Sequence, residues 1–179
     1  MESRFVISGI YSLPFTGNRL KEGWQISLLE QTQAGNPLNF RTSVSGFTGN
    51  ATLRPNVTGP VQAGFSPSTN GAATSVQYIA NPSVFVNQGN AFGNLGRNAI
   101  IGPGFSNLDF ALAKDTKITE RFTLQFRADA FDALNQTNFA NPTAIVGSST
   151  LGIITAGTRY AAGDFGTSRQ IQLSAKLKF

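Results

Sequence analysis

The last segment of the chain, residues 169–179, alternates strictly between apolar and polar side chains. Its odd positions from 171 onward are all apolar: Ile171, Leu173, Ala175, Leu177 and Phe179. Its even positions are polar, Gln172 and Ser174 among them. Successive side chains of a strand point to opposite sides, so a period of two gives one apolar face and one polar face. This segment is therefore predicted to be an amphipathic β-strand.

The same period of two occurs in four earlier stretches of the chain. They predict strands over residues 4–13, 23–33, 106–118 and 121–134. The clearest contrast lies after residue 121, where apolar residues at even positions alternate with Gln125, Arg127 and Asp129. In the first stretch Val6 and Ile10 weaken the contrast between the two faces.

The connections between these five strands alternate in length. Short turns join the first strand to the second and the third to the fourth, whereas long segments rich in Gly, Asn, Pro and Ser occupy residues 35–104 and 136–168. Short turns on one side and long loops on the other are typical of strands that cross a membrane, with the turns in the periplasm and the loops outside. The predicted fold is therefore all-β, an antiparallel transmembrane β-barrel fragment of about five strands.

The odd or even position of a residue in a strand decides which face its side chain joins, and we call this its parity. Parity also predicts the register of the hairpin around residue 120. A two-residue turn would place Leu112 opposite Arg127, which puts apolar and charged side chains on one face. A three-residue loop over 119–121 places Leu112 opposite Ala128 instead, and it avoids the aspartate pair that a five-residue loop would create. The three-residue loop is the predicted connection.

Composition excludes several classes of function. The chain has no Cys and no His, so thiol and imidazole catalysis and most metal sites are absent, and we expect no catalytic residue, no bound metal and no cofactor. The net charge is +5, but the basic residues are scattered rather than gathered in a run or on a helix face. We therefore expect no nucleic-acid partner.

The beginning of the chain shows no basic leader followed by a long apolar stretch, and no apolar run is long enough for a transmembrane helix. Two interpretations follow from this. The protein is cytoplasmic, or the sequence is the tail of a longer chain.

Other candidate sites have weak support. Asp129 and Asp132 differ by three positions, which in a strand sends them to opposite faces, so they are expected to be solvated or rim aspartates rather than a catalytic pair. Four glycines of the first long loop surround Arg97 without a phosphate-binding lysine or a helical pattern. The sequence leaves two possible roles for Arg97, Phe85 and Phe92. These side chains contact a ligand, or they pack into the mouth of the barrel.

Several blocks of the chain, in order, resemble the end of the Oar-like TonB-dependent transporters. These blocks are Tyr11–Phe15, Gly23–Gln25, Phe92–Asn98, Gly102–Asp109, Arg121–Asn135, Thr137–Phe139 and Arg169–Phe179. Members of that family are large outer-membrane barrels that often carry a carboxypeptidase-regulatory-like domain. The resemblance implies import of a bulky nutrient, such as a siderophore or a glycan, through the bacterial outer membrane.

The resemblance also implies partners and a departure from the family pattern. Outer-membrane lipid, the barrel-assembly machinery and TonB are the implied partners, TonB acting through a plug domain that these residues do not contain. The alternating residues from Ile171 to Phe179 resemble the assembly signal of such barrels. Five strands cannot close a barrel, so the chain is either a fragment of a longer transporter, which is the favoured interpretation, or a truncated remnant.

On this interpretation the apolar side chains of each strand face lipid and the alternating polar side chains face the lumen. The predicted lumen-facing residues are Gln125, Arg127, Asp129, Gln172 and Ser174. Glu30 and Lys114 fall on the lipid-facing parity, and both are expected at the membrane rim, where a charge costs little. The alternative is a small secreted or surface β-sheet module for binding or adhesion, which would bury its apolar faces against each other.

Overall fold

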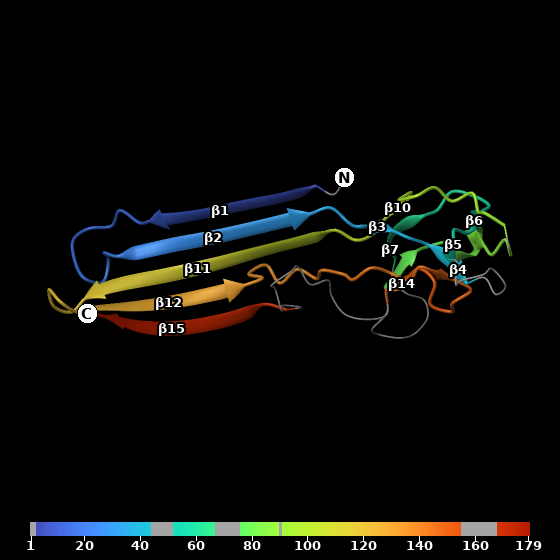
Figure 1. The fold of residues 1–179 in the computed structure, drawn as a ribbon. Helices are drawn as coiled ribbons and strands as arrows, with labels where there is room; N and C mark the ends of the chain where they lie inside the picture. Colours follow the sequence, from blue (N-terminus) through green and yellow to red (C-terminus); the bar gives the residue numbers. More distant parts are fainter. Residues whose placement is uncertain (1–2, 44–51, 67–75, 90, 155–167) are drawn as a thin grey trace.

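The computed structural model describes residues 3–43, 52–66, 76–89, 91–154 and 168–179. Figure 1 shows an elongated molecule, with one long sheet at one end and a smaller lobe of short strands at the other. The chain passes from the sheet into the lobe after β2 and again after β12. The predicted strands and the predicted long loops therefore occupy separate parts of the molecule.

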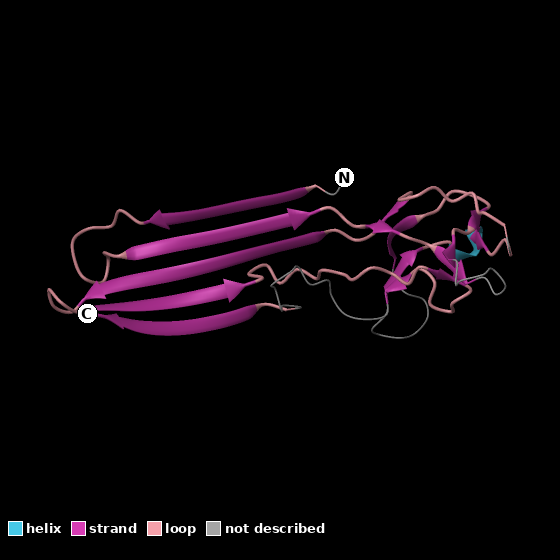
Figure 2. Ribbon diagram, in the orientation of Figure 1, coloured by secondary structure: helices cyan, strands magenta, loops and turns pink. Residues whose placement is uncertain are grey.

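Five long strands form a single antiparallel sheet in the order β1-β2-β11-β12-β15. Their bounds are Arg4–Ser12 for β1, Trp24–Gln33 for β2, Phe105–Lys117 for β11, Thr123–Phe131 for β12 and Gln170–Lys178 for β15. All four pairings within the sheet are antiparallel, and Figure 2 shows strands running the full length of this end of the molecule. The all-β, antiparallel, five-stranded fold predicted from the alternation is confirmed.

The register predicted for the hairpin between β11 and β12 is confirmed as well. Leu112 pairs with Ala128. The turn closes with the backbone N–H of Ile118 donating to the carbonyl of Phe122 at 2.9 Å. Two arguments selected this register: a shift by one residue would exchange the two faces of β12, and a shift by two would place Asp109 opposite Asp129.

The fourth strand ends earlier than the sequence indicated. It was expected to continue to residue 134, but β12 stops at Phe131, because Asp132 adopts the left-handed conformation with φ of 47°. Asn135 is also left-handed, with φ of 53°. Of the two alternatives for Asp132, the solvated one is wrong, since the residue is 5% exposed and its side chain accepts a hydrogen bond from the backbone N–H of Gln136. A position at the rim stays a prediction.

The described parts of the two long connections, 34–104 and 139–154, form the lobe, which we call the loop lobe. It contains short strands and one turn of 3-10 helix, with these bounds: β3 Pro37–Leu38, β4 Arg41–Ser43, β5 Thr52–Leu53, β6 Asn56–Val57, β7 Ala63–Ser66, β8 Val76–Ile79, η1 Pro82–Val84, β9 Phe85–Val86, β10 Ile100–Ile101, β13 Ile145–Val146 and β14 Ile153–Ile154. Two pairings join the two connections to each other, β13 with β4 and β14 with β8. The second connection thus completes sheets that the first begins.

The loop lobe has an apolar core of its own, which the sequence did not indicate. Ten buried side chains form it, including Phe40, Ile79, Phe85 and Ile154. The rings of Phe40 and Phe85 stack with centroids 4.5 Å apart. The two long connections predicted from the sequence thus fold together, because apolar side chains from both of them bury one another.

Candidate functional site

The register of the five long strands sorts their side chains into two faces. Residues directly opposite one another in a sheet point to the same side. One row across the sheet joins Tyr11, Ile26, Leu112, Ala128 and Leu173. The neighbouring row, one position along, joins Ser12, Gln25, Ala113, Arg127 and Ser174. We call these the apolar face and the polar face.

The apolar face is exposed along its length. Phe126 is 51% exposed and Leu173 is 78% exposed. On the same face, Phe5, Ile7 and Tyr11 of β1 are exposed at the opposite edge of the sheet. Soluble monomers rarely expose a contiguous apolar surface that crosses a whole sheet. Such a face requires a partner or lipid to cover it.

The residues of the predicted assembly signal lie on this face, in β15 and at the chain end. Ile171, Leu173, Ala175 and Leu177 sit opposite Ala130, Ala128, Phe126 and Leu124 of β12. The far edge of β15 pairs with no other strand of the described sheet. The structure therefore places the predicted signal on an edge strand; its recognition by an assembly machinery stays a prediction.

The five predicted lumen-facing residues lie together on the polar face. In the pairing of β12 with β15, Asp129 is opposite Gln172 and Arg127 is opposite Ser174, with Gln125 two positions further along. An ion pair joins the two charged members, with Arg127 Nη2 and Asp129 Oδ1 2.7 Å apart. The structure brings these residues together, and whether they line a lumen stays a prediction.

A shallow hollow of about 580 Å³ opens on the polar face. Most of its lining comes from polar-face residues of four strands: Ser8, Ile10, Ser27, Leu29, Asp109, Ala111, Arg127, Asp129 and Phe131. The face is thus not uniformly polar, because three large apolar side chains belong to it. On β12, the charged residues that line the hollow are Arg127 and Asp129.

Lys114 lies on the apolar face, in a row with Trp24 and Phe126. Its side chain is 8% exposed, and its ammonium donates to the backbone carbonyls of Arg19 and Glu22 in the turn between β1 and β2. The long side chain thus carries its charge from the apolar face to the turn end of the sheet. This is the position expected for a lysine at a membrane rim.

Glu30 occupies the opposite end of the apolar face, between Ile7 and Leu108. Its carboxylate accepts hydrogen bonds from the hydroxyls of Thr32 at 3.0 Å and Ser106 at 3.3 Å. Lys114 and Glu30, the two charged residues of the apolar face, therefore both have polar partners, each toward a different end of the sheet.

Sequence reasoning missed a set of side chains that hold the end of β12 against β11. The Asp109 carboxylate accepts from the backbone N–H of Asp132 at 3.0 Å. The Asn138 amide bonds both the N–H and the carbonyl of Ser106. The signal for this feature was the cluster of Asp and Asn after Phe131, since both residue types tolerate left-handed backbone and bond nearby backbone groups.

Within the described residues no group of acidic side chains is arranged to hold a metal ion. No described helix is long and apolar enough to cross a membrane.

Comparison with known proteins decides the family. The family model described as an outer membrane beta barrel domain matches residues 1–172. The chain belongs to this family. This outer-membrane β-barrel domain resides in the bacterial outer membrane, and the described strands form an open antiparallel sheet of five. No curated protein and no solved structure matches the chain.

Proposed function

We propose that the chain is the C-terminal portion of an Oar-like TonB-dependent transporter, which imports a bulky nutrient such as a siderophore or a glycan. One observation carries this proposal: five amphipathic strands share one register, so that a continuous exposed apolar face backs a polar face. Membership of the outer-membrane β-barrel family supports it. The resemblance of the sequence blocks supplies the transporter type.

In this proposal the apolar face contacts lipid and the polar face lines the lumen. Hydrocarbon offers no hydrogen bonds, so backbone groups must pair within the sheet while apolar side chains face outward. The Arg127–Asp129 pair and the hollow beside it then belong to the wall of the transport path. The role of the chain is structural and transporting, without a catalytic residue.

A complete transporter needs more strands than this sheet supplies. Barrel closure takes about eight strands at least, whereas the described sheet ends in free edges at β1 and β15. Upstream strands would continue from the β1 edge, and the barrel-assembly machinery would recognise the β15 edge by main-chain pairing. TonB would act through a plug domain elsewhere in the full-length protein.

The proposal is tested by fractionating native cells and blotting with an antibody against the peptide Arg169–Phe179. We expect a band several times heavier than 19.0 kDa in the outer-membrane fraction. A band of chain size in that fraction would contradict the proposed transporter while leaving the membrane location intact.

A second candidate is a small surface module for binding or adhesion. The compact core of the loop lobe favours it, because a lobe that buries its own apolar side chains is suited to binding. In the same experiment, a band of chain size outside the membrane fraction would support this candidate.

A further inference from the structure

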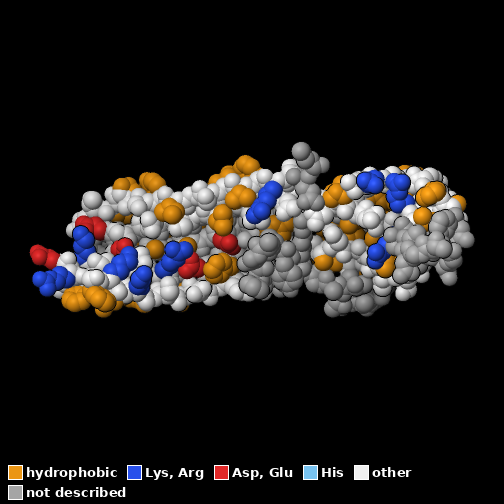
Figure 3. All heavy atoms as spheres, viewed as in Figure 1, with side chains coloured by type: hydrophobic (Ala, Val, Ile, Leu, Met, Phe, Trp, Pro, Cys, Tyr) orange, Lys and Arg blue, Asp and Glu red, His pale blue; other side chains and the backbone are white. Residues whose placement is uncertain are grey.

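The loop lobe is positively charged and lacks counter-charges. Residues 34–104 contain three charged residues, Arg41, Arg54 and Arg97, and no Asp, Glu or Lys. The described part of the second connection, 139–154, contains no charged residue. Figure 3 agrees, since the described surface of the lobe shows Lys/Arg colouring and no Asp/Glu colouring.

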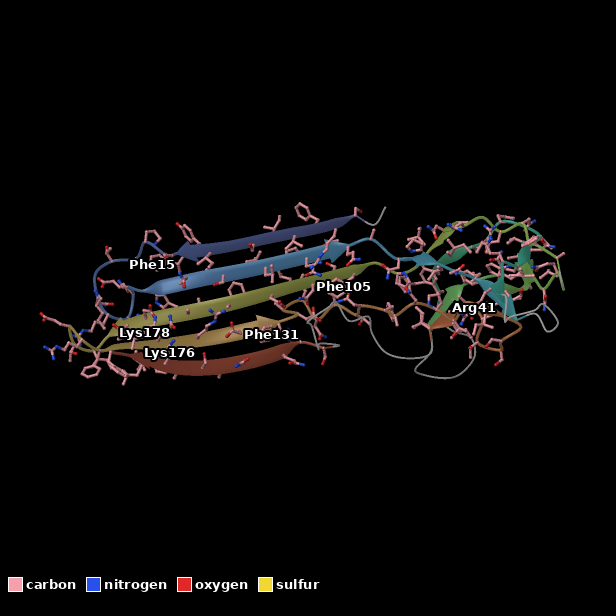
Figure 4. The ribbon with its side chains drawn as sticks, in the orientation of Figure 1. Phe15, Arg41, Phe105, Phe131, Lys176 and Lys178 are labelled. Atoms are coloured by element: carbon pink, nitrogen blue, oxygen red, sulfur yellow. The ribbon has the colours of Figure 1, made fainter. Side chains whose placement is uncertain are left out.

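All three arginine side chains are exposed. The two ion pairs of the described residues both lie on the long sheet, so no carboxylate of the described part of the chain pairs with these guanidinium groups. Figure 4 places Arg41 on the lobe, at the opposite end of the molecule from Lys176 and Lys178. The guanidinium groups are therefore available to an anion from outside the chain.

Arg41 and Arg54 flank one strand pair of the loop lobe. Thr42 of β4 pairs with Leu53 of β5 in antiparallel fashion. Arg41 precedes Thr42 and Arg54 follows Leu53, so the two arginines leave this antiparallel pair at the same end, where like charges repel each other. An anion bound between them would remove this repulsion.

Arg97 follows a segment that is fixed against Arg54. The Gln88 amide donates to the carbonyls of both Arg54 and Ala91. The backbone N–H of Leu95 donates to the carbonyl of Pro55 at 3.2 Å. Residues 91–95 are thus held against 54–55, and Arg97 follows this segment two residues later.

An exposed aromatic ring belongs to the same segment. Of the two phenylalanines left open by the sequence, Phe85 is 5% exposed and stacks in the core of the lobe, whereas Phe92 is 85% exposed. Gly93, the next residue, lies directly against the Arg54 and Pro55 carbonyls. Phe92 is therefore presented to solvent close to Arg54.

We propose that Arg41, Arg54, Arg97 and Phe92 form a binding site for an acidic glycan. Guanidinium groups bind carboxylate and phosphate oxygens in a bidentate manner, and an exposed aromatic ring offers an apolar surface to the face of a sugar. This inference rests on the proposed function in one respect, because it assigns the nutrient class captured at the outer side of the barrel. The binding itself requires no transport.

The test measures binding of the full chain, purified in detergent, to immobilised polygalacturonate, with neutral dextran as the control surface. We expect saturable binding to polygalacturonate only, weakened by raising NaCl to about 0.5 M. Substituting the three arginines together by glutamine is expected to weaken binding by about tenfold or more. Arg121→Gln, which removes an exposed charge from the turn at the other end of the molecule, is expected to leave binding unchanged.

The Phe92→Ser variant separates glycan binding from simple anion binding, because it keeps every charge and removes the ring. Weaker binding in this variant supports the glycan site. Unchanged binding of the triple variant, equal binding to dextran, or binding to lipid A vesicles but not to polygalacturonate would overturn the proposal. If polygalacturonate binds as expected while the native-cell blot lacks the heavy outer-membrane band, the transporter proposal fails and the glycan site stands.

Discussion

The Asn138 side chain holds the backbone of Ser106 from both sides. Its Oδ1 accepts from the Ser106 N–H and its Nδ2 donates to the Ser106 carbonyl, each at 2.9 Å. The amide thus provides at the start of β11 the two hydrogen bonds that a neighbouring strand would provide. We expect Asn138→Ala to lower the free energy of unfolding by about 1–3 kcal/mol, because it leaves backbone groups without partners.

Urea unfolding of the full chain in detergent measures this change. Thr137→Ala is the matched control, since Thr137 is exposed and its substitution is expected to change stability by less than about 0.5 kcal/mol. Equal urea midpoints of unfolding for the Asn138→Ala and Thr137→Ala variants would contradict the role assigned to the Asn138 amide.

Gly93 is required by close packing in the loop lobe. A Cβ at this position would collide with the backbone carbonyls of Arg54 and Pro55. Gly93→Ala is therefore expected to destabilise the lobe by about 1–3 kcal/mol or more. The control is Gly64→Ala, because a Cβ there meets no atom within 4 Å. Limited proteolysis of the lobe should be faster in the first variant alone, and equal rates in both would refute the packing argument.

The long sheet was predictable because each of its strands carries a period-two pattern over many residues. The alternation of the side chains, together with the repulsion between Asp109 and Asp129 in the alternative register, was enough to predict the pairing of Leu112 with Ala128. The loop lobe was not predictable in the same way, since its strands are two to four residues long and show no period. Its core joins side chains distant in sequence, such as Phe40 and Phe85, whose contact no local pattern indicates.

Lys114 fastens the turn between β1 and β2 to the end of the sheet. Lys114→Met keeps the apolar stem but removes the donor to the carbonyls of Arg19 and Glu22. We expect trypsin to cleave after Arg19 about tenfold faster in this variant, because local opening of the turn becomes easier. Lys117→Met, an exposed neighbour on the same strand, should leave the rate unchanged. A Lys114 variant with the control rate would contradict the anchoring role.

Tyr78 gives the loop lobe a dependence on alkaline pH. Its hydroxyl donates to the carbonyl of Ile101 at 2.8 Å, and burial raises the pKa of the Tyr78 hydroxyl above 10.0. The unfolded chain then loses this proton at lower pH than the folded chain, so stability falls as pH rises above about 10. Tyr78→Phe is expected to lower the free energy of unfolding by about 1 kcal/mol at neutral pH. Between pH 9 and 11 the free energy of unfolding of this variant should fall less than that of the unsubstituted chain. Parallel pH profiles for the two proteins, measured by urea unfolding, would contradict this account.

The candidate site was only partly predictable. The alternation of polar and apolar residues predicted that Arg127 and Asp129 share one face, because it fixes the side to which each strand residue points. Parity carries no information on the left-handed turn at Asp132, whose backbone is held by Asp109. The exposure of Phe92 and the burial of Phe85 likewise depended on tertiary packing.

The central claim is that alternate residues of the long strands face lipid and water. The chain has no cysteine, so a spin label can be attached to single cysteines introduced in turn at positions 123–128 of the chain in outer membranes. We expect oxygen, which concentrates in lipid, to reach labels at 124, 126 and 128 best, and a water-soluble nickel chelate to reach labels at 123, 125 and 127 best. Equal accessibility along the segment, or nickel access on the even positions, would contradict the assignment of the apolar face to lipid.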